Sequence, residues 1–179
     1  MSELTEQYLA TCRRFTDVVD AVTDWSAPSP CEEWTAADVV EHVVSGEQKF
    51  LREQGADLAE LPGDGPAERW HAHVEQAGSV LADEGFARRE YDGFMGPTTP
   101  EKQLASFYGF DQAVHRWDLG RAAGLDVELT GAELDSVEAN LDALGDMLYT
   151  QGACHDPLEA PDGADRQTRL LARMGRRAG

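Results

Sequence analysis

Apolar residues in the N-terminal part of the chain recur at the spacing of an amphipathic helix. Residues 2–21 carry this pattern and predict a first helix with one face turned towards a core. The segment "DWSAPSPCEEW" then interrupts the pattern with two prolines, which indicates a loop. Thr35 followed by Asp38 is a capping-box pattern, so we expect a second helix to begin at Thr35.

The middle of the chain predicts two more helices. A third, of weaker apolar content, covers about residues 67–83. A fourth begins at Thr98 or Thr99, with Pro100 in its first turn, where the missing N–H of proline is tolerated. The periodic pattern of this fourth helix continues to about Gly124, with no interruption expected.

The C-terminal part adds a fifth helix and a short final one. Thr130 and Glu133 form another capping-box pattern for a helix that ends near Tyr149, and "RQTRLLARMG" predicts the last helix. No segment shows a strand pattern of any weight, although "ARREYDGF" would suit a short extended piece. We therefore expect an all-α protein, a four-helix bundle with additional short helices, in a single domain spanning residues 1–179.

Composition narrows the classes of partner. The formal net charge of −19 opposes binding to phosphate backbones and to anionic lipid, so neither a nucleic acid nor a membrane is expected as a partner. The three cysteines include no CxxC pair, and they indicate neither a disulfide framework nor a zinc ribbon. Reduced thiols and the absence of an apolar N-terminal signal core favour a cytoplasmic location.

The segment "DQAVHRWDLG" places charge in a stripe that should be apolar. Residues four apart share one face of a helix, so Asp111 and His115 extend the stripe that begins at Leu104 and passes through Phe107. A carboxylate that leaves water without a partner is strongly destabilising. Asp111 must therefore be paired within the protein or bind a metal ion.

His42 presents the same problem on the second helix, where valines flank it on both sides. If the second and fourth helices are neighbours, His42 can meet Asp111 and His115. Two imidazoles and one carboxylate with an open fourth position are typical of catalytic zinc sites, and Fe²⁺ or Ni²⁺ would also accept these donors. On spacing alone, a hydrogen-bonded Asp–His pair beside a core histidine is the commoner arrangement, and that alternative stays open.

The stretch "SPCEEWTAADVVEH", followed later by "DQAVHRWDLGRAAG", resembles the actinobacterial DinB-like metal-binding proteins. The closer likeness is to the group related to the metal-binding domain of mycothiol-dependent maleylpyruvate isomerase, and the closing "ADRQTRLLARMGR" is similar too. This resemblance implies a four-helix bundle that holds a divalent metal, usually zinc, on His42, Asp111 and His115.

Two features depart from that family. Its pattern has Glu at the position of Asp111, whose side chain is one methylene shorter. The isomerase also has an additional C-terminal domain that contributes to the substrate site, whereas this chain closes with a short tail helix. Maleylpyruvate isomerisation itself is therefore not expected.

A metal site with an open position favours an anionic ligand, and a thiol bound there loses its proton readily. The resemblance implies a low-molecular-weight thiol such as mycothiol. The first hypothesis is a metal-dependent thiol S-transferase that joins a small-molecule thiol to an electrophilic substrate. The alternatives are a metal-dependent hydrolase and a non-catalytic protein that binds metal or a small ligand. A homodimer is plausible.

Other residues near these motifs are weaker candidates. Glu47, one turn beyond His42, would suit a general base, although a solvated helix face is the simpler interpretation. Asp118 would either orient a metal ligand or pair with Arg121. Cys31 is expected to be a buried loop thiol and not a ligand, because residues 35–42 alone span about 10 Å of helix.

The remaining histidines and tryptophans are assigned structural roles. His71 and His73 are two positions apart on a helix, so they point in different directions, and both are expected at the surface. Cys154 and its neighbouring histidine are expected in a solvated loop. Two tryptophans are expected to serve packing: Trp34 and Trp117.

Overall fold

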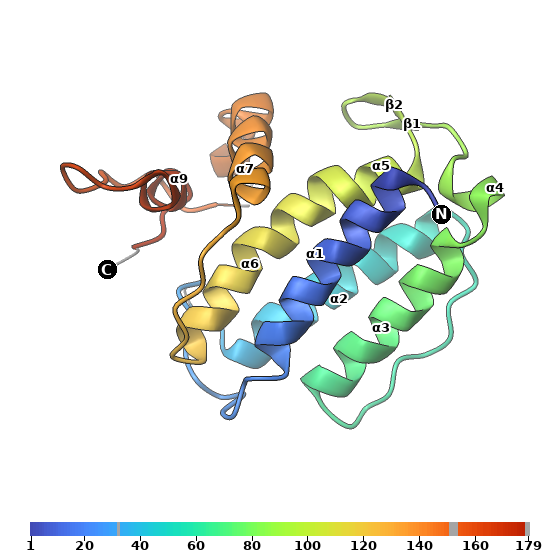
Figure 1. Ribbon diagram of the computed structural model, residues 1–179, viewed down its shortest axis with the longest axis horizontal. Helices are drawn as coiled ribbons and strands as arrows, with labels where there is room; N and C mark the ends of the chain where they lie inside the picture. Colours follow the sequence, from blue (N-terminus) through green and yellow to red (C-terminus); the bar gives the residue numbers. More distant parts are fainter. Residues whose placement is uncertain (32, 151–153, 178–179) are drawn as a thin grey trace.

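The computed structural model describes residues 1–31, 33–150 and 154–177, and helices make up most of them (Figure 1). The long helices are α1 (Glu3–Val19), α2 (Ala36–Glu53), α3 (Pro66–Leu81), α6 (Gly109–Ala122) and α7 (Gly131–Leu144). The short elements are α4 (Glu84–Ala87), β1 (Tyr91–Gly93), β2 (Gly96–Thr98), α5 (Pro100–Gln103), the π-helical turn η1 (Leu104–Tyr108), α8 (Met147–Thr150) and α9 (Arg166–Arg173). The all-α expectation is confirmed.

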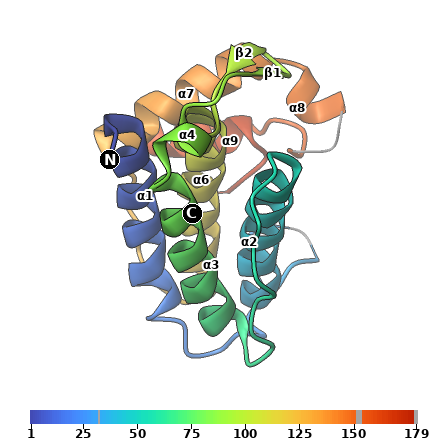
Figure 2. The ribbon, with the colours of Figure 1, turned by 90° about the vertical axis from the view of Figure 1, so that its right-hand side faces the viewer.

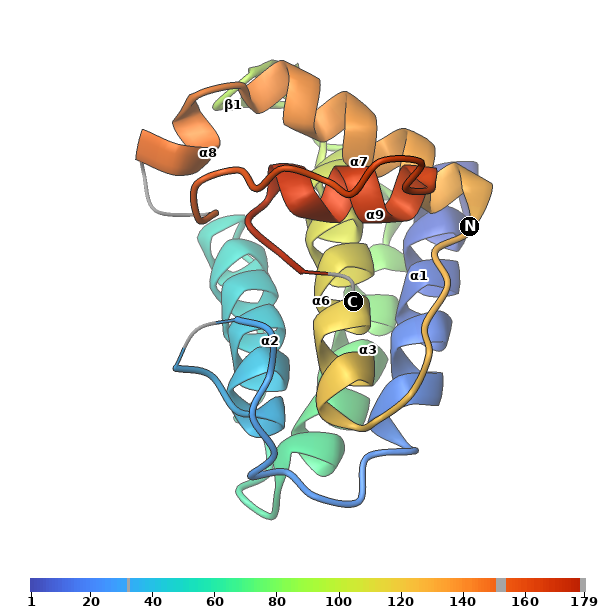
Figure 3. The same cartoon turned by 90° about the vertical axis from the view of Figure 1, so that its left-hand side faces the viewer.

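Four of the long helices, α1, α2, α3 and α6, lie side by side (Figures 2 and 3). Helix α6 contacts α1 and α2, and α3 contacts the same two helices, so each of the four packs against two neighbours. Their apolar faces share one buried core, which includes Tyr8, Phe15, Val43, Leu51, Trp70 and Leu119. Because α2 and α6 are direct neighbours, the condition for bringing His42 to Asp111 and His115 is met.

The helix starts follow the capping patterns in the sequence. The Thr35 side chain accepts the Asp38 N–H, and the Asp38 carboxylate accepts the Thr35 N–H in return. The same reciprocal pair joins Thr130 and Glu133 at the start of α7. These contacts satisfy backbone donors that the first turn of a helix leaves unpaired, so both predicted starts are confirmed.

The predicted fourth helix is not uniform. It consists of α5 and α6 joined by the π-helical turn η1, whose wider hydrogen-bonding pattern lies at Leu104–Tyr108. A π turn accommodates one extra residue in a helix and rotates the side chains around it. The expected continuous stripe through Phe107 is therefore broken one turn before Asp111.

Two other expectations are corrected. The fifth helix ends at Leu144 and not near Tyr149, because Gly145 has a positive φ of 51° that ends α7. The expectation of no strand is wrong, since β1 and β2 form an antiparallel hairpin in which Tyr91 pairs with Thr98. The strand β1 falls within the segment for which a short extended piece was considered.

The C-terminal elements cover the bundle. Helix α7 crosses one end of the four packed helices and contacts α6, and α9 packs against α7 (Figure 3). None of the described helices is both long and apolar enough to cross a membrane. The interpretation of residues 1–179 as one domain stays a prediction.

A buried ionic contact fixes α7 on the bundle. Glu133 is buried, and its carboxylate accepts hydrogen bonds from Arg14 of α1 at 2.9 Å and from Arg116 of α6 at 2.8 Å. Burial opposes the ionisation of Glu133, but the Thr130 N–H and the Arg116 guanidinium hold its pKa below its usual value. The ionised form therefore stabilises the folded state.

We predict that Glu133→Gln lowers the free energy of unfolding at pH 7 by about 2–4 kcal/mol, because it leaves Arg116 buried without its charge partner. A depressed folded-state pKa contributes stability above the unfolded pKa and loses it as pH falls through the folded pKa. In urea unfolding, the difference from wild type should therefore shrink as the pH falls below about 4.5.

The matched control is Glu138→Gln, on the same helix. The Glu138 side chain is 46% exposed and pairs with Arg166 at the surface, so its neutralisation should change stability by less than about 1 kcal/mol. A Glu133→Gln protein as stable as this control at pH 7 would show that the buried contact does not fix α7.

Candidate metal centre

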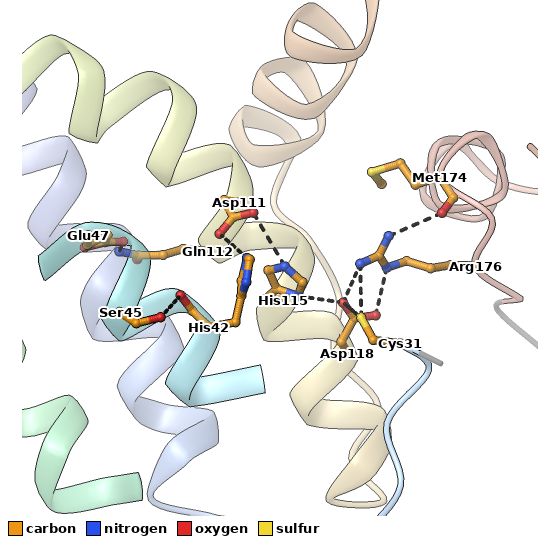
Figure 4. A network of polar contacts seen from close by, with 10 residues as sticks. All are labelled: Cys31, His42, Ser45, Glu47, Asp111, Gln112, His115, Asp118, Met174 and Arg176. Atoms are coloured by element: carbon orange, nitrogen blue, oxygen red, sulfur yellow. Dashed lines mark hydrogen bonds and ion pairs between the residues drawn. The ribbon is translucent and has the colours of Figure 1, made fainter. Parts of the chain in front are cut away.

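The second and fourth predicted helices bring three side chains together (Figure 4). His42 of α2 and His115 of α6 both direct Nε2 at the Asp111 carboxylate, at 3.6 Å from Oδ2 and 3.5 Å from Oδ1 respectively. The three candidate ligand atoms lie within 4.8 Å of one another. We call His42, Asp111 and His115 the ligand triad.

The distances in the ligand triad suit a shared ion better than direct hydrogen bonds. Donor–acceptor distances in hydrogen bonds to oxygen are roughly 2.7–3.2 Å, and both contacts to Asp111 exceed this. Ligand atoms about 2.1 Å from a tetrahedral zinc ion lie about 3.4 Å from one another. The donor types and the spacing therefore fit a divalent metal with nitrogen and oxygen ligands.

A second carboxylate fixes the orientation of His115. Asp118, one turn further along α6, accepts a hydrogen bond from His115 Nδ1 at 2.9 Å. In the neutral form of His115, which is the form that binds a metal, this contact would keep the ring proton on Nδ1 and leave Nε2 free to act as a ligand. A metal-ligating histidine commonly has such a partner on its other nitrogen.

Asp118 is itself held by the C-terminal segment. Arg176 donates from Nε to Oδ1 at 2.8 Å and from Nη2 to Oδ2 at 2.7 Å, a two-point contact that matches the planar guanidinium to the carboxylate. Asp118 is fully buried and Arg176 is nearly so. The pair thereby connects residues 58 positions apart in sequence.

A second possible ligand group, Cys31, His115 and Asp118, lies beside the first. The Cys31 thiol donates to Asp118 Oδ2 at 3.3 Å. However, the Arg176 guanidinium occupies both oxygens of that carboxylate, and its positive charge opposes a cation there. The ligand triad is therefore the better candidate for a metal site, and Cys31 lies beside it.

The electrostatics of the site match these contacts. Burial opposes the ionisation of Asp111, but the adjacent His115 and His42 hold its pKa well below its usual value. Burial likewise opposes the charged form of His115, but Asp111 and Asp118 raise its pKa well above the usual value. Arg176 and His115 lower the pKa of Asp118 to about 2 against the effect of burial. Both carboxylates are ionised at neutral pH.

The ligand triad opens onto a cavity of about 530 Å³, the triad cavity. Trp34 forms one wall, with its ring centroid 4.8 Å from that of His42 and 5.7 Å from that of His115. The His42 side chain is 43% exposed and that of His115 8%, so the open side of the ligand triad is at His42. Besides these residues, the cavity is lined by Pro30, Cys31, Gly46, Phe107, Tyr108, Asp111, Cys154, His155 and Arg176.

The tail reaches this cavity through a close backbone approach. Gly175 has a positive φ of 77°, and a Cβ at this position would lie 2.5 Å from the Cβ of His155. Only glycine fits there, and it allows the chain to place Arg176 over Asp118. Cys154 and His155 lie in a loop as expected, with His155 exposed and Cys154 half-buried, and both line the triad cavity.

Comparison with known proteins identifies the family of the chain. Residues 8–120, which include the whole ligand triad, match the family described as the mycothiol maleylpyruvate isomerase N-terminal domain. The chain belongs to this family. The family is associated with metal binding and with mycothiol-related function, and the resemblance inferred from the sequence motifs is confirmed.

The chain also has relatives in mycobacteria. Uncharacterized proteins of Mycobacterium tuberculosis strains CDC 1551 and H37Rv are each 32% identical over 123 residues, which cover 63% of this chain. The chain spans 64% of the length of these relatives. No solved structure matches the chain.

Within this family member, Glu47 lies away from the ligand triad. It is fully buried, and its carboxylate accepts hydrogen bonds from Tyr8 at 2.6 Å, Gln112 at 2.6 Å and His73 at 2.8 Å. It is not among the residues that line the triad cavity. The interpretation of Glu47 as part of a solvated helix face is therefore wrong. Its role as a general base stays a prediction, which its burial away from the triad cavity does not favour.

The expectation for His73 is also corrected. It is fully buried between α2 and α3, where Glu47 and Gln48 contact its two ring nitrogens. His71, two positions earlier, is half-exposed as expected and contacts Asp20. The sequence signal was available: His73 lies three residues after Trp70 and four before Ala77, both in the core.

Three other residues beside the site, Asp118, Cys31 and Arg176, were predicted from the sequence to different extents. Of the two roles considered for Asp118, the contact with His115 is present, and Arg121 instead lies over the Trp117 ring. Cys31 is close to the site because the loop before α2 turns back along the helix, which the rise per residue alone does not reveal. Arg176 was missed, since a basic residue in a tail carries no signal of its partner.

We predict that Asp118→Asn lowers the affinity for a divalent metal about 10–100-fold, because an amide no longer fixes the His115 tautomer. Competition with a chelator on protein shown to be folded measures the change. The control is Asp142→Asn, at a side chain that is 67% exposed and pairs with Arg173. Equal affinities in the two variants would rule out an orienting role for Asp118.

Proposed function

We propose that this protein binds a divalent metal, in the first place Zn²⁺, on the ligand triad and acts as a metal-dependent thiol S-transferase. The observation that carries the proposal is the placement of two imidazoles and one ionised carboxylate at metal-ligand spacing on the wall of a cavity of about 530 Å³. Three protein ligands beside an open volume favour a site that accepts an external ligand.

A divalent ion in this position supplies Lewis acidity, which favours the deprotonated form of a thiol or water ligand. Two neutral histidines and one carboxylate carry a charge of −1, so a site loaded with a divalent ion has a net charge of about +1 and attracts an anion. The membership in a mycothiol-related family supports a thiol as that ligand.

The chain's own residues have distinct tasks in this proposal. Asp118 keeps the proton on His115 Nδ1, so that Nε2 is available as a donor. Arg176 neutralises Asp118 and holds it in place. Trp34 packs against both imidazoles, stacked on His115 and tilted against His42, and so restricts how the two rings can move. The open volume beside His42 remains for a small-molecule thiol and an electrophilic substrate.

The shorter side chain of Asp111 affects the choice of metal. Its carboxylate extends one methylene less from α6 than the Glu of the isomerase pattern, so the ion lies closer to α6. Zn²⁺ has no preferred geometry of its own and tolerates such a shift. Fe²⁺ and Ni²⁺ remain the alternatives that the donor types admit.

The first test concerns the metal. Gently purified protein should hold about one divalent ion per chain, measured by elemental analysis. His42→Ala and His115→Ala should each lose it, because two remaining ligands bind weakly. His71→Ala, at the half-exposed histidine of α3, is the control and should retain it. Metal-free wild-type protein that takes up no Zn²⁺ would contradict the proposal.

The second test concerns the thiol. In the Co²⁺-substituted protein, a small thiol that enters the coordination sphere should produce a thiolate–cobalt charge-transfer band, and His42→Ala should abolish it. Ethanethiol and mycothiol are suitable probes. A protein that holds cobalt but gives no band with either thiol is not a thiol transferase, and the hydrolase and the non-catalytic binding protein then become the better hypotheses.

The remaining expectations stay predictions. They are the cytoplasmic location, the absence of nucleic-acid and membrane partners, and the homodimer. The three cysteines are free in the structure, which agrees with reduced thiols.

A further inference from the structure

A second cavity, the apolar cleft, lies beyond the triad cavity. It has a volume of about 440 Å³ and is bordered by the β1–β2 hairpin, the turn η1 and helices α7 and α8. Its lining is mainly apolar and includes Phe94, Met95, Phe107, Leu144, Met147 and Leu148. Small-molecule sites are typically cavities of roughly 300–1,000 Å³ with apolar walls and a few polar groups.

The hairpin contributes its most apolar residues to this cleft. Phe94 and Met95, at the tip between β1 and β2, are 77% and 67% exposed. Large apolar side chains that gather at an exposed hollow mark a binding surface more often than single scattered ones. Lys102 and Asn140 line the same cleft and provide polar groups there.

The apolar cleft is adjacent to the triad cavity, and the two share a wall. Phe107 lines both the apolar cleft and the triad cavity. Between them lies a small cavity of about 60 Å³, which Leu148 shares with the apolar cleft and which Asp111 and His115 share with the triad cavity. The Phe107 side chain therefore separates two parts of one elongated space.

The π turn explains why Phe107 has this position. It lies in η1, where the extra residue rotates side chains away from the regular helical stripe. Phe107 is 37% exposed, while Leu104 and Ala105 in the same turn are buried. Phe107 thus lies at the boundary between the core and solvent, and π turns of this kind are frequent at functional sites.

We propose that the apolar cleft binds the alkyl chain or aromatic ring of an amphipathic small molecule whose polar end reaches the ligand triad past Phe107. This inference rests on the proposed function, because the triad supplies the polar end of the site. The shared wall with the triad cavity favours a small molecule over a protein partner, since a protein segment seated in the cleft alone would leave that wall unused.

The first experiment measures binding of apolar molecules to the cleft in the absence of metal. Straight-chain alcohols from butanol to octanol compete with a fluorescent apolar dye, anilinonaphthalene sulfonate, on the metal-free protein. Burial of each added methylene should strengthen binding about fourfold until the cleft is filled. His71→Ala, at the half-exposed histidine of α3, should give the same series as wild type.

The discriminating variant is Met95→Asp, which places a charge at an exposed position of the cleft wall and should not affect folding. It should weaken octanol binding at least tenfold. Ser79→Asp adds the same charge at an exposed position of α3 and should leave the series unchanged. Equal octanol binding by Met95→Asp and Ser79→Asp would overturn the inference.

The Co²⁺-substituted protein tests whether a thiol bound at the ligand triad also fills the apolar cleft. The affinity of alkanethiols from ethanethiol to octanethiol, read from the charge-transfer band, should rise about fourfold per methylene in wild type and remain nearly flat in Met95→Asp. A flat series in wild type, with ethanethiol bound, overturns the inference and leaves the proposed function standing. Alcohol binding without any thiol band supports the cleft and overturns the proposed function.

A second copy of the chain is the competing occupant. Sedimentation of wild type and Met95→Asp tests it directly. A wild-type dimer that excludes the alcohols and becomes monomeric in Met95→Asp would overturn the inference, because the cleft would then be an interface.

Discussion

The buried ion pair between Asp118 and Arg176 is the interaction on which the site depends. A carboxylate that is fully removed from water is tolerated only with strong partners, and Arg176 supplies two hydrogen bonds and a full charge. Once Asp118 is ionised and fixed, it orients His115 towards Asp111. The same pair draws the C-terminal segment over α6, so one contact both arranges a ligand and encloses the cavity beside it.

Glu47 and Asp111, two carboxylates of the same bundle, differ in how far neighbouring side chains use their hydrogen-bonding capacity. Glu47 accepts three short hydrogen bonds from neighbouring side chains, so its acceptor capacity is used within the core. Asp111 has contacts of 3.5 and 3.6 Å with two imidazoles, which leave its oxygens available at the wall of a cavity. The first arrangement favours a rigid core, and the second has the unmet capacity that metal binding would satisfy.

Prediction from sequence succeeded where the determinants are local. Helix periodicity and the capping residues Thr35 and Thr130 depend on neighbours within a few positions, and both predicted starts are present. The spacing of Asp111 and His115 likewise follows from the helical repeat. It failed where several elements contribute to one environment, as for His73, which looks like a surface residue until α2 packs over it.

The sequence by itself determined the helical class and the main helix starts, because both rest on short-range backbone geometry, and its motifs indicated the family. It also named His42, Asp111 and His115 as candidate metal ligands, which the structure brings together. Only the tertiary structure decided that α2 lies beside α6, that Arg176 returns to Asp118, and that the hairpin and α7 enclose an apolar cleft next to the triad. These features join residues far apart in the chain, and their pairing depends on how complete helices bury their apolar faces together.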